Sequence, residues 1–226
     1  MTAKPPSHKL LACISASLGG RLCGRSVLVR CYNNLYQMFE DRGMAISDVC
    51  ASTDQLLRRI DATEPVLRGV LTDDKTDDRT AEGNMKKTKT MTTTTLVYVD
   101  VEERTGVKFL RALREEHPDD HVLIVNVDGP TPFTRKEMDE AVVEFWQVRE
   151  LIINPTRHHL VPKHTGLDAA RAQELRARRC MLYHQFPVLM ATDIIARWHR
   201  YPKGTIVEIQ RRGLAHEEGL YYRKVA

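Results

Sequence analysis

The sequence lacks paired cysteines, long apolar runs and the glycine-rich strings that hold phosphates. Its 226 residues include five cysteines, and none of them falls in a Cys-x-x-Cys pair. A disulfide scaffold or a four-cysteine zinc site is therefore disfavoured, and a reducing compartment is expected. No apolar run approaches the ~20 residues that span a bilayer, so no membrane segment is expected. P-loop, dinucleotide-binding and Gly-x-Ser-x-Gly strings are also missing, which leaves those enzyme classes without their markers.

The side chains that most often build metal sites occur here in unsuitable patterns. His158, His159 and His164 flank a Leu-Val-Pro string that keeps the chain extended, so we expect exposed or core-edge histidines. The acidic pairs at 73–78 lack the glycine and the terminal glutamate of a calcium loop. A metal-dependent nuclease needs an acidic residue two positions before a lysine, and only Asp73, in a loop, has that spacing. No catalytic, metal-binding or cofactor-binding residue is predicted, and no cofactor.

Charge divides the chain into two parts. Residues 151–226 carry 13 Lys and Arg against 6 Asp and Glu, whereas residues 1–150 carry 21 against 24. A basic C-terminal part suits either nucleic acid or an acidic protein partner. A solvated basic surface explains the same charges equally well.

The N-terminus is short of acidic residues. The first 39 residues contain no Asp or Glu, and residues 10–18 are mildly apolar, as in a mitochondrial transit peptide or a weak secretory signal. Because serines interrupt this stretch and the cysteines are unpaired, we expect a loose extension over residues 1–24 instead. From Arg25 to Arg42, apolar residues recur every three or four positions, which predicts an amphipathic helix that ends at Gly43.

The middle of the chain predicts alternating strands and helices. The expected elements are, in order, a helix capped by Ser47 through about Ile60, a mobile loop over 73–95, a strand over 93–101, a helix from Thr105, a buried strand over 121–127, a turn over 128–132 and a helix with the capping box Thr134-x-x-Glu137. Strand, helix, strand, helix, strand is an α/β pattern.

Asn154-Pro155 is the expected domain boundary, with an α/β domain over 25–154 and a second domain over 155–226. In the second domain we expect a helix from Asp168 to about Arg179, a short helix capped by Thr192 or Asp193, and a hairpin of strands over 205–211 and 220–225. The predicted fold class is α/β (α+β): an α/β module with a small mixed sheet, followed by a small mixed β-sheet domain with two short helices.

Several short strings resemble one family in the same order. His159-Leu-Val-Pro-Lys-His164 is similar to its H-x-L-V-P-x-H segment, Asp193-Ile-Ile-Ala-Arg-Trp198 to its D-P-V-A-R-Y, and 203–209 to its K-R-G-x-V-V-K-I, with Tyr222-Arg223 at its final Y-R. This family is the fifth subunit shared by eukaryotic nuclear RNA polymerases, and it has a shorter counterpart in the archaeal enzyme. More loosely, Asp41-Arg-Gly43, Gly106-Val-Lys108 and Thr131-Pro132 resemble strings of the eukaryotic N-terminal half.

The sequence departs from the family pattern at several points. Ile194 stands where the family has proline, and the segment between Glu217 and Tyr222 lacks an Arg-Tyr pair. These departures favour a divergent paralogue.

The resemblance implies a non-catalytic subunit of a DNA-directed RNA polymerase in the nucleus, in the nucleoplasm or nucleolus. It implies a jaw near downstream duplex DNA, docking on the largest subunit, other polymerase subunits as partners, and no membrane. The expected partner-binding residues are His159, Pro162, His164, Arg197, Trp198, Tyr222 and Arg223, and the expected DNA-proximal residues are Thr131 and Pro132. A metal-dependent nuclease and a stand-alone nucleic-acid-binding protein remain as alternatives.

Overall fold

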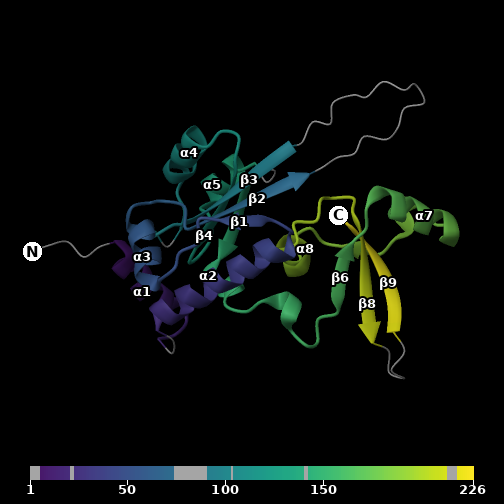
Figure 1. Cartoon of the computed structure of the whole chain (residues 1–226), viewed down its shortest axis with the longest axis horizontal. Coiled ribbons are helices and arrows are strands. Elements are labelled where there is room, and N and C mark those ends of the chain that lie inside the picture. The colour runs from purple at the N-terminus through teal and green to yellow at the C-terminus, as the bar shows by residue number, and fades with distance from the viewer. Residues whose placement is uncertain (1–5, 21–22, 74–90, 103, 140–141, 213–217) are drawn as a thin grey trace, which may run out of the picture. The chain divides into compact units, whose positions relative to one another are not determined.

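The structure, a computed structural model, describes the whole chain except residues 1–5, 21–22, 74–90, 103, 140–141 and 213–217. The chain forms two compact units, Met1–Ile153 and Asn154–Ala226, which divide one residue before the predicted boundary. Figure 1 shows the first in purple to green and the second in green to yellow. Most of the predicted mobile loop and most of the predicted hairpin loop lie outside the described residues.

The N-terminal unit is built on a five-stranded sheet in the order β1-β2-β3-β4-β5. The strands are β1 (Ala45–Ser47), β2 (Leu67–Asp73), β3 (Met91–Val99), β4 (His121–Asn126) and β5 (Val143–Gln147). The first three are antiparallel, whereas β3, β4 and β5 are parallel and are joined by α4 (Val107–Glu116) and α5 (Pro132–Glu137). The predicted alternation of strand and helix is confirmed, and every residue of β4 is buried.

Helices cover both faces of this sheet. Leu110 and Leu113 of α4 pack on Leu96 and Val122, which are cross-strand partners on one face. The other face lies against α2 (Gly24–Asp41), and Gly69 of β2 marks the contact: a Cβ atom there would lie 2.5 Å from the Phe39 ring. The sheet is therefore the middle of three layers, with α4 and α5 on one side and α2 on the other, as Figure 1 shows.

The expected loose extension is wrong for residues 6–17, which form helix α1 (Pro6–Ser17). Leu10 and Ile14 have no exposed surface. The Ser7 amide and hydroxyl donate to the two carboxylate oxygens of Asp61, at 2.6 and 3.0 Å. Because α1 also contacts α2 and α3 (Thr53–Asp61), it is part of the fold of this unit.

Two predicted helix caps are also wrong. Ser47 lies in β1, and Ser52 caps α3 by accepting from the Gln55 amide. Thr131 rather than Thr134 caps α5, because the Thr131 side chain accepts from the Thr134 amide. Strand β2 was not predicted, and the expected loop over 73–95 is shorter, because β2 reaches Asp73 and β3 begins at Met91.

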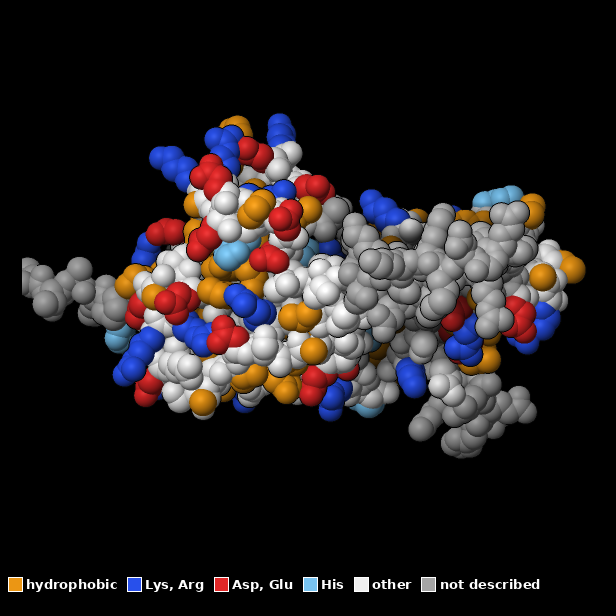
Figure 2. Space-filling model, turned by 45° about the horizontal axis from the view of Figure 1, so that its top comes forward, with side chains coloured by type: hydrophobic (Ala, Val, Ile, Leu, Met, Phe, Trp, Pro, Cys, Tyr) orange, Lys and Arg blue, Asp and Glu red, His pale blue; other side chains and the backbone are white. Residues whose placement is uncertain are grey.

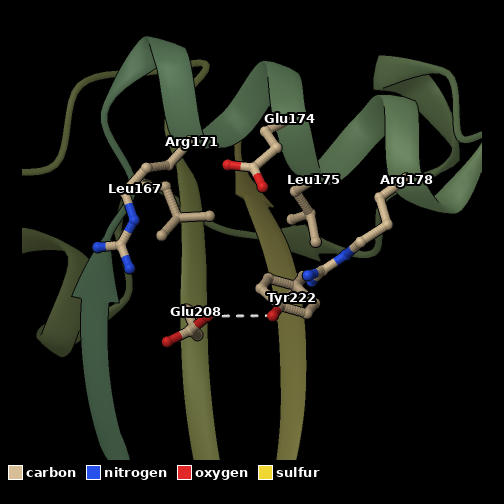
Figure 3. Close-up of a pocket in the computed structure, with 7 residues that line it drawn as sticks. All are labelled: Leu167, Arg171, Glu174, Leu175, Arg178, Glu208 and Tyr222. Atoms are coloured by element: carbon tan, nitrogen blue, oxygen red, sulfur yellow. Dashed lines mark hydrogen bonds between the residues drawn. The ribbon is translucent and has the colours of Figure 1, made fainter.

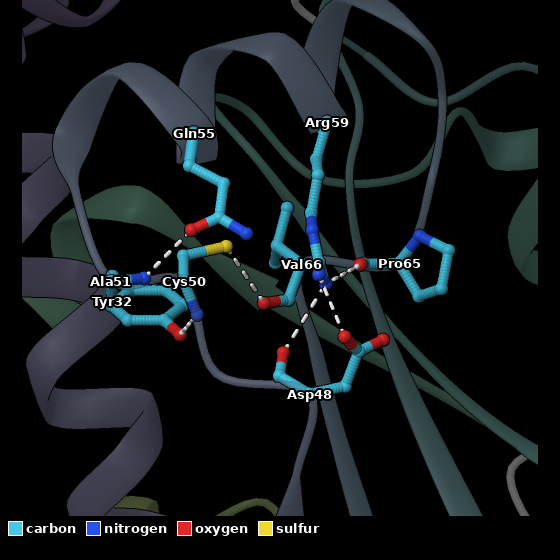
Figure 4. Close-up of polar contacts among 8 residues, drawn as sticks. All are labelled: Tyr32, Asp48, Cys50, Ala51, Gln55, Arg59, Pro65 and Val66. Atoms are coloured by element: carbon cyan, nitrogen blue, oxygen red, sulfur yellow. Dashed lines mark hydrogen bonds and ion pairs between the residues drawn. The ribbon is translucent and has the colours of Figure 1, made fainter.

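Arg59 fixes the chain before and after α3, as Figure 4 shows. Its guanidinium donates to the Asp48 carbonyl at 3.2 Å, to the Asp48 carboxylate at 2.7 Å and to the Pro65 carbonyl at 3.1 Å. The bond from Arg59 holds the pKa of Asp48 below its ordinary value. Nearby, the Cys50 amide donates to the Tyr32 hydroxyl at 2.7 Å, which ties the same loop to α2.

The C-terminal unit is a four-stranded sheet in the order β6-β8-β9-β7. Its elements are η1 (Pro155–Arg157), β6 (Lys163–Gly166), α7 (Ala169–Arg179), η2 (Tyr183–Gln185), β7 (Val188–Leu189), α8 (Ile194–Trp198), β8 (Ile206–Arg212) and β9 (Glu218–Val225). Helix α6 (Val148–Leu151) precedes them and ends the first unit. Asp168 caps α7 as predicted, and Asp193, one of the two predicted candidates, caps α8. Strand β8 pairs with β9 in an antiparallel ladder. The prediction of an α+β fold is confirmed.

In the part of the chain that the structure describes, no helix is both long and apolar enough to cross a membrane.

Candidate functional site

Strand register separates the predicted partner-binding residues onto two faces of the C-terminal sheet. His164 pairs with Ile209 and Ile209 with Tyr221, whereas Glu208 pairs with Tyr222. Cross-strand partners share a face and successive residues alternate. We call the side that carries His164, Arg211, Tyr221 and Arg223 the hairpin face. The opposite side, which carries Tyr222 under α7, we call the helix face.

The hairpin face combines an exposed tyrosine with cationic side chains. Tyr221 is 54% exposed, and the Arg211 guanidinium lies over its ring at 5.2 Å from the centroid. Arg223 follows two residues along the same strand face and is half-buried. Exposed tyrosine beside arginine is the composition of interface centres. Apart from Arg223, this cluster was missed, because the sequence does not show which tyrosine faces outward.

His164, in β6, lies on the hairpin face and bonds to Pro162 in the segment before that strand. A carbonyl only accepts, so the His164 Nδ1 atom carries a proton and donates to the Pro162 carbonyl, 2.7 Å away. Burial lowers the pKa of His164, the Pro162 bond and Asp193 oppose this, and the charges of Arg211 and Arg223 lower it further. Pro162 is half-buried, whereas His159 is exposed and its ring stacks on His158 at 4.7 Å. These rings thus meet one another rather than converging with His164.

Helix α8 contains Trp198, a predicted partner contact that its burial does not support. Trp198 has no exposed surface, so its side chain cannot present a surface to a partner, and it belongs to the core. Ile195 is also buried, whereas Ile194 and Arg197 are half-buried. Of the two predicted contact residues on α8, only Arg197 keeps some exposed surface.

The helix face holds a small cavity between α7 and the sheet, which Figure 3 shows. It has a volume of about 160 Å³. The Tyr222 hydroxyl donates to the Glu208 carboxylate at 3.0 Å, and the Arg179 guanidinium lies 4.9 Å from the centre of the Tyr222 ring. Burial, followed by the bond to Glu208, raises the pKa of Tyr222. Two arginines and two glutamates line this cavity, so its charges balance: Arg171, Arg178, Glu174 and Glu208.

Thr131 and Pro132 begin α5 in the N-terminal unit, above a buried polar network. The Asn126 side chain donates to the Thr105 hydroxyl at 2.8 Å and accepts from the Gly129 amide at 2.7 Å. The Thr134 hydroxyl donates to the Thr105 carbonyl at 2.9 Å. This network follows the carboxyl end of β4, where open α/β sheets place their sites. It fixes the backbone that carries the two predicted DNA-proximal residues.

Beside them stands Phe133, which is 77% exposed and was not predicted as a contact residue. Arg135 and Lys136, on the same helix, are also exposed. Figure 2 shows basic and acidic side chains interspersed on the visible face of the N-terminal unit. Charge alone therefore does not mark a nucleic-acid surface on that face.

Among the described residues, no group of three His, Cys, Asp or Glu side chains is placed to hold a metal ion.

Comparison with known proteins assigns the C-terminal unit. Residues 153–225 match the family model described as RNA polymerase Rpb5, C-terminal domain. The C-terminal unit is therefore similar to the Rpb5 C-terminal domain, over about a third of the whole chain. The match contains every string of this region that resembled the polymerase subunit, from His159 to Arg223, and the predicted resemblance is confirmed.

Proteins similar to this chain are named as polymerase subunits from several eukaryotes. The subunit RPABC1 of DNA-directed RNA polymerases I, II and III from Caenorhabditis elegans is 26% identical over 136 residues, which cover 57% of this chain and 64% of that protein. The corresponding Dictyostelium discoideum subunit is 29% identical over 113 residues, 47% of this chain and 57% of that protein. Subunit 5A of DNA-directed RNA polymerase V from Arabidopsis thaliana is 30% identical over 83 residues, 37% of each chain. The matched segments thus span less than two thirds of these relatives, at identities of 26–30%.

Proposed function

We propose that this chain is a non-catalytic, structural subunit of a multi-subunit DNA-directed RNA polymerase in the nucleus, as a divergent paralogue of the shared fifth subunit. The observation that carries the proposal is the Rpb5 C-terminal domain match over 153–225, which covers almost all of a compact unit. The relatives are named as polymerase subunits, and they support DNA-templated transcription as the process.

The hairpin face is the proposed docking surface for the largest polymerase subunit. Tyr221 is exposed and sits beside Arg211, and Arg223 extends the same side of β9. Tyrosine and arginine at the centre of a patch contribute most of the binding energy in many interfaces. His159, Pro162, His164 and Arg197 are proposed to extend this contact.

The proposed second contact is downstream duplex DNA, next to the start of α5. Thr131 and Pro132 are held by the buried network, and Phe133, Arg135 and Lys136 are exposed beside them. Two cations on a rigid support suit contact with phosphates. A photoreactive amino acid at Phe133 should cross-link to downstream DNA in a transcribing complex, whereas the same group at exposed Val49 should not.

Affinity purification of the tagged full-length chain from nuclei, followed by mass spectrometry, tests the main proposal. The largest subunit and the other polymerase subunits should co-purify in stoichiometric amounts, and the largest subunits identified should show whether one nuclear polymerase or several contain the chain. Recovery of the chain alone would refute the proposal. Magnesium-dependent cleavage of DNA by the pure chain would favour a nuclease, and steeply salt-dependent binding by the monomer would favour a stand-alone nucleic-acid-binding protein.

A further inference from the structure

A groove on the helix face, beside the small balanced cavity, has different chemistry. Its volume is about 500 Å³, and it lies between α7 and the turn before β8. Small or branched apolar side chains line its floor: Leu167, Ala169, Ala172 and Ile206. We call it the tyrosine groove, because Tyr183 stands in its wall.

Two cations lie over the Tyr183 ring, and a third lines the same groove. Arg176 and Lys203 line the groove, and the Lys224 ammonium lies 5.0 Å from the centre of the Tyr183 ring. The Arg176 guanidinium lies 5.6 Å from the same centre. Within the described part of the chain, none of the three forms an ion pair with a carboxylate. These three positive charges thus face the groove without a carboxylate partner, whereas the neighbouring cavity balances two arginines with two glutamates.

Arg176 has unused hydrogen-bonding capacity. Its Nε atom is enclosed and has no hydrogen-bond partner among the described residues. A buried donor without a partner is unfavourable, and an acceptor bound in the groove would relieve this. The guanidinium fork fits a carboxylate through two parallel hydrogen bonds.

From these contacts we infer that the tyrosine groove binds an acidic segment of a partner protein. A leucine or similar side chain of that segment packs on Leu167, Ala169 and Ala172, and neighbouring glutamate or aspartate carboxylates pair with Arg176 and Lys203. The apolar floor favours protein over nucleic acid, because a phosphate backbone gains nothing from small aliphatic side chains. Tyr183, over which two cations already lie, is a poor platform for a base. This inference goes beyond the proposed function, since it names a partner chemistry and does not depend on assembly into a polymerase.

The test is a titration of the full-length chain with a short fluorescent peptide that alternates glutamate and leucine, followed by fluorescence anisotropy. Arg176→Glu and Lys203→Glu should each weaken binding about tenfold or more, because each change places a like charge against the peptide. Arg171→Glu and Arg178→Glu are matched controls on the other side of α7, and they should change binding less than about threefold. Thermal melting of each variant checks that it is folded.

If the groove variants and the control variants lose equal peptide affinity, the binding is general electrostatic attraction to a basic helix, and the inference is overturned. Undiminished binding by folded Arg176→Glu would also overturn it, and so would equal binding of a peptide with glutamine in place of glutamate. If single-stranded DNA binds more tightly than the peptide and loses affinity in the same variants, the groove is a nucleic-acid site instead. None of these outcomes depends on co-purification with a polymerase.

Discussion

The two units use their arginines differently. In the N-terminal unit, Arg42 and Arg59 form ion pairs with carboxylates of the same unit, and the Arg42 side chain is only 5% exposed. In the C-terminal unit, Arg176, Arg179 and Arg211 lie over tyrosine rings. An aromatic ring attracts a guanidinium but leaves most of its N–H donors unused. The first unit therefore uses its charges for its own stability, whereas the second keeps them available to an external partner.

The buried pair of Arg42 and Glu144 gives the largest expected effect. Arg42 donates to both carboxylate oxygens of Glu144, at 3.0 and 2.8 Å, and Trp146 donates to the same carboxylate. Although burial raises the pKa of Glu144, the charge and bonds of Arg42 hold it below its ordinary value. Arg42→Ala leaves this carboxylate unpaired and should lower the free energy of unfolding by about 3–5 kcal/mol, measured in urea.

The exposed pair of Arg111 and Glu137 is the control for this prediction, and Arg111→Ala should cost less than about 1 kcal/mol. Arg42→Ala combined with Glu144→Gln should recover part of the loss. A loss for Arg42→Ala no larger than that for Arg111→Ala would contradict the claim that this unit depends on internal charge pairs.

Arg59 gives a smaller effect. Arg59→Ala removes the bonds to Asp48 and Pro65 and should lower the free energy of unfolding by about 1.5–3 kcal/mol. Arg58 is its exposed neighbour on α3, and Arg58→Ala should change stability by less than about 0.5 kcal/mol. Similar values for the two variants would show that the contacts of Arg59 contribute nothing measurable.

Tyr221 tests the second half of the comparison. Tyr221→Ala should leave the melting temperature nearly unchanged and should weaken incorporation into the purified polymerase about tenfold, because an exposed aromatic residue contributes to binding rather than to folding. Leu182 is similarly exposed elsewhere on the unit, so Leu182→Ala is the control. A lower melting temperature with normal incorporation would place Tyr221 in the fold rather than in the interface.

The smallest effect concerns pH. Because burial holds the pKa of His164 below its ordinary value, the unfolded chain takes up the proton first as pH falls. His164 thus makes stability decline as pH falls from about 7 through about 6.5. His164→Gln should flatten that decline in urea titrations at pH 7.5, 6.5 and 5.5. An unchanged slope would show that other groups control it.

Periodicity in the sequence predicted the elements whose apolar residues follow one repeat. The stripe of α2, from Leu28 to Phe39, is buried as predicted, and so is the continuous run of β4. Strand β2 escaped detection because Arg68 and Gly69 interrupt its apolar residues, and Gly69 is required by the approach of Phe39. Helix α1 was missed because serines interrupt its apolar pattern. One of these serines, Ser7, is nevertheless buried, and its hydrogen bonds to Asp61 satisfy its polar groups.

The candidate site was harder to predict, because it depends on which neighbour covers each residue. Trp198 and Tyr221 are both aromatic residues beside an arginine, yet one is core and the other exposed. A five-residue helix does not reveal its covered side from spacing alone. The separation of His164 from Tyr222 follows from strand pairing, which joins β6 to β8 across 41–47 positions of sequence and so leaves no local pattern.

The attachment of α2 to the end of its unit has a consequence during synthesis on the ribosome. Asn34 donates to the Leu151 carbonyl and Arg42 to Glu144, across 117 and 102 residues of sequence. Helix α2 is therefore translated long before β5 and α6 exist. At about 5–20 residues per second, the part of α2 that packs on α6 stays uncovered for several seconds. The nascent chain should need a chaperone over that interval, and it should release the chaperone only once Leu151 has left the exit tunnel.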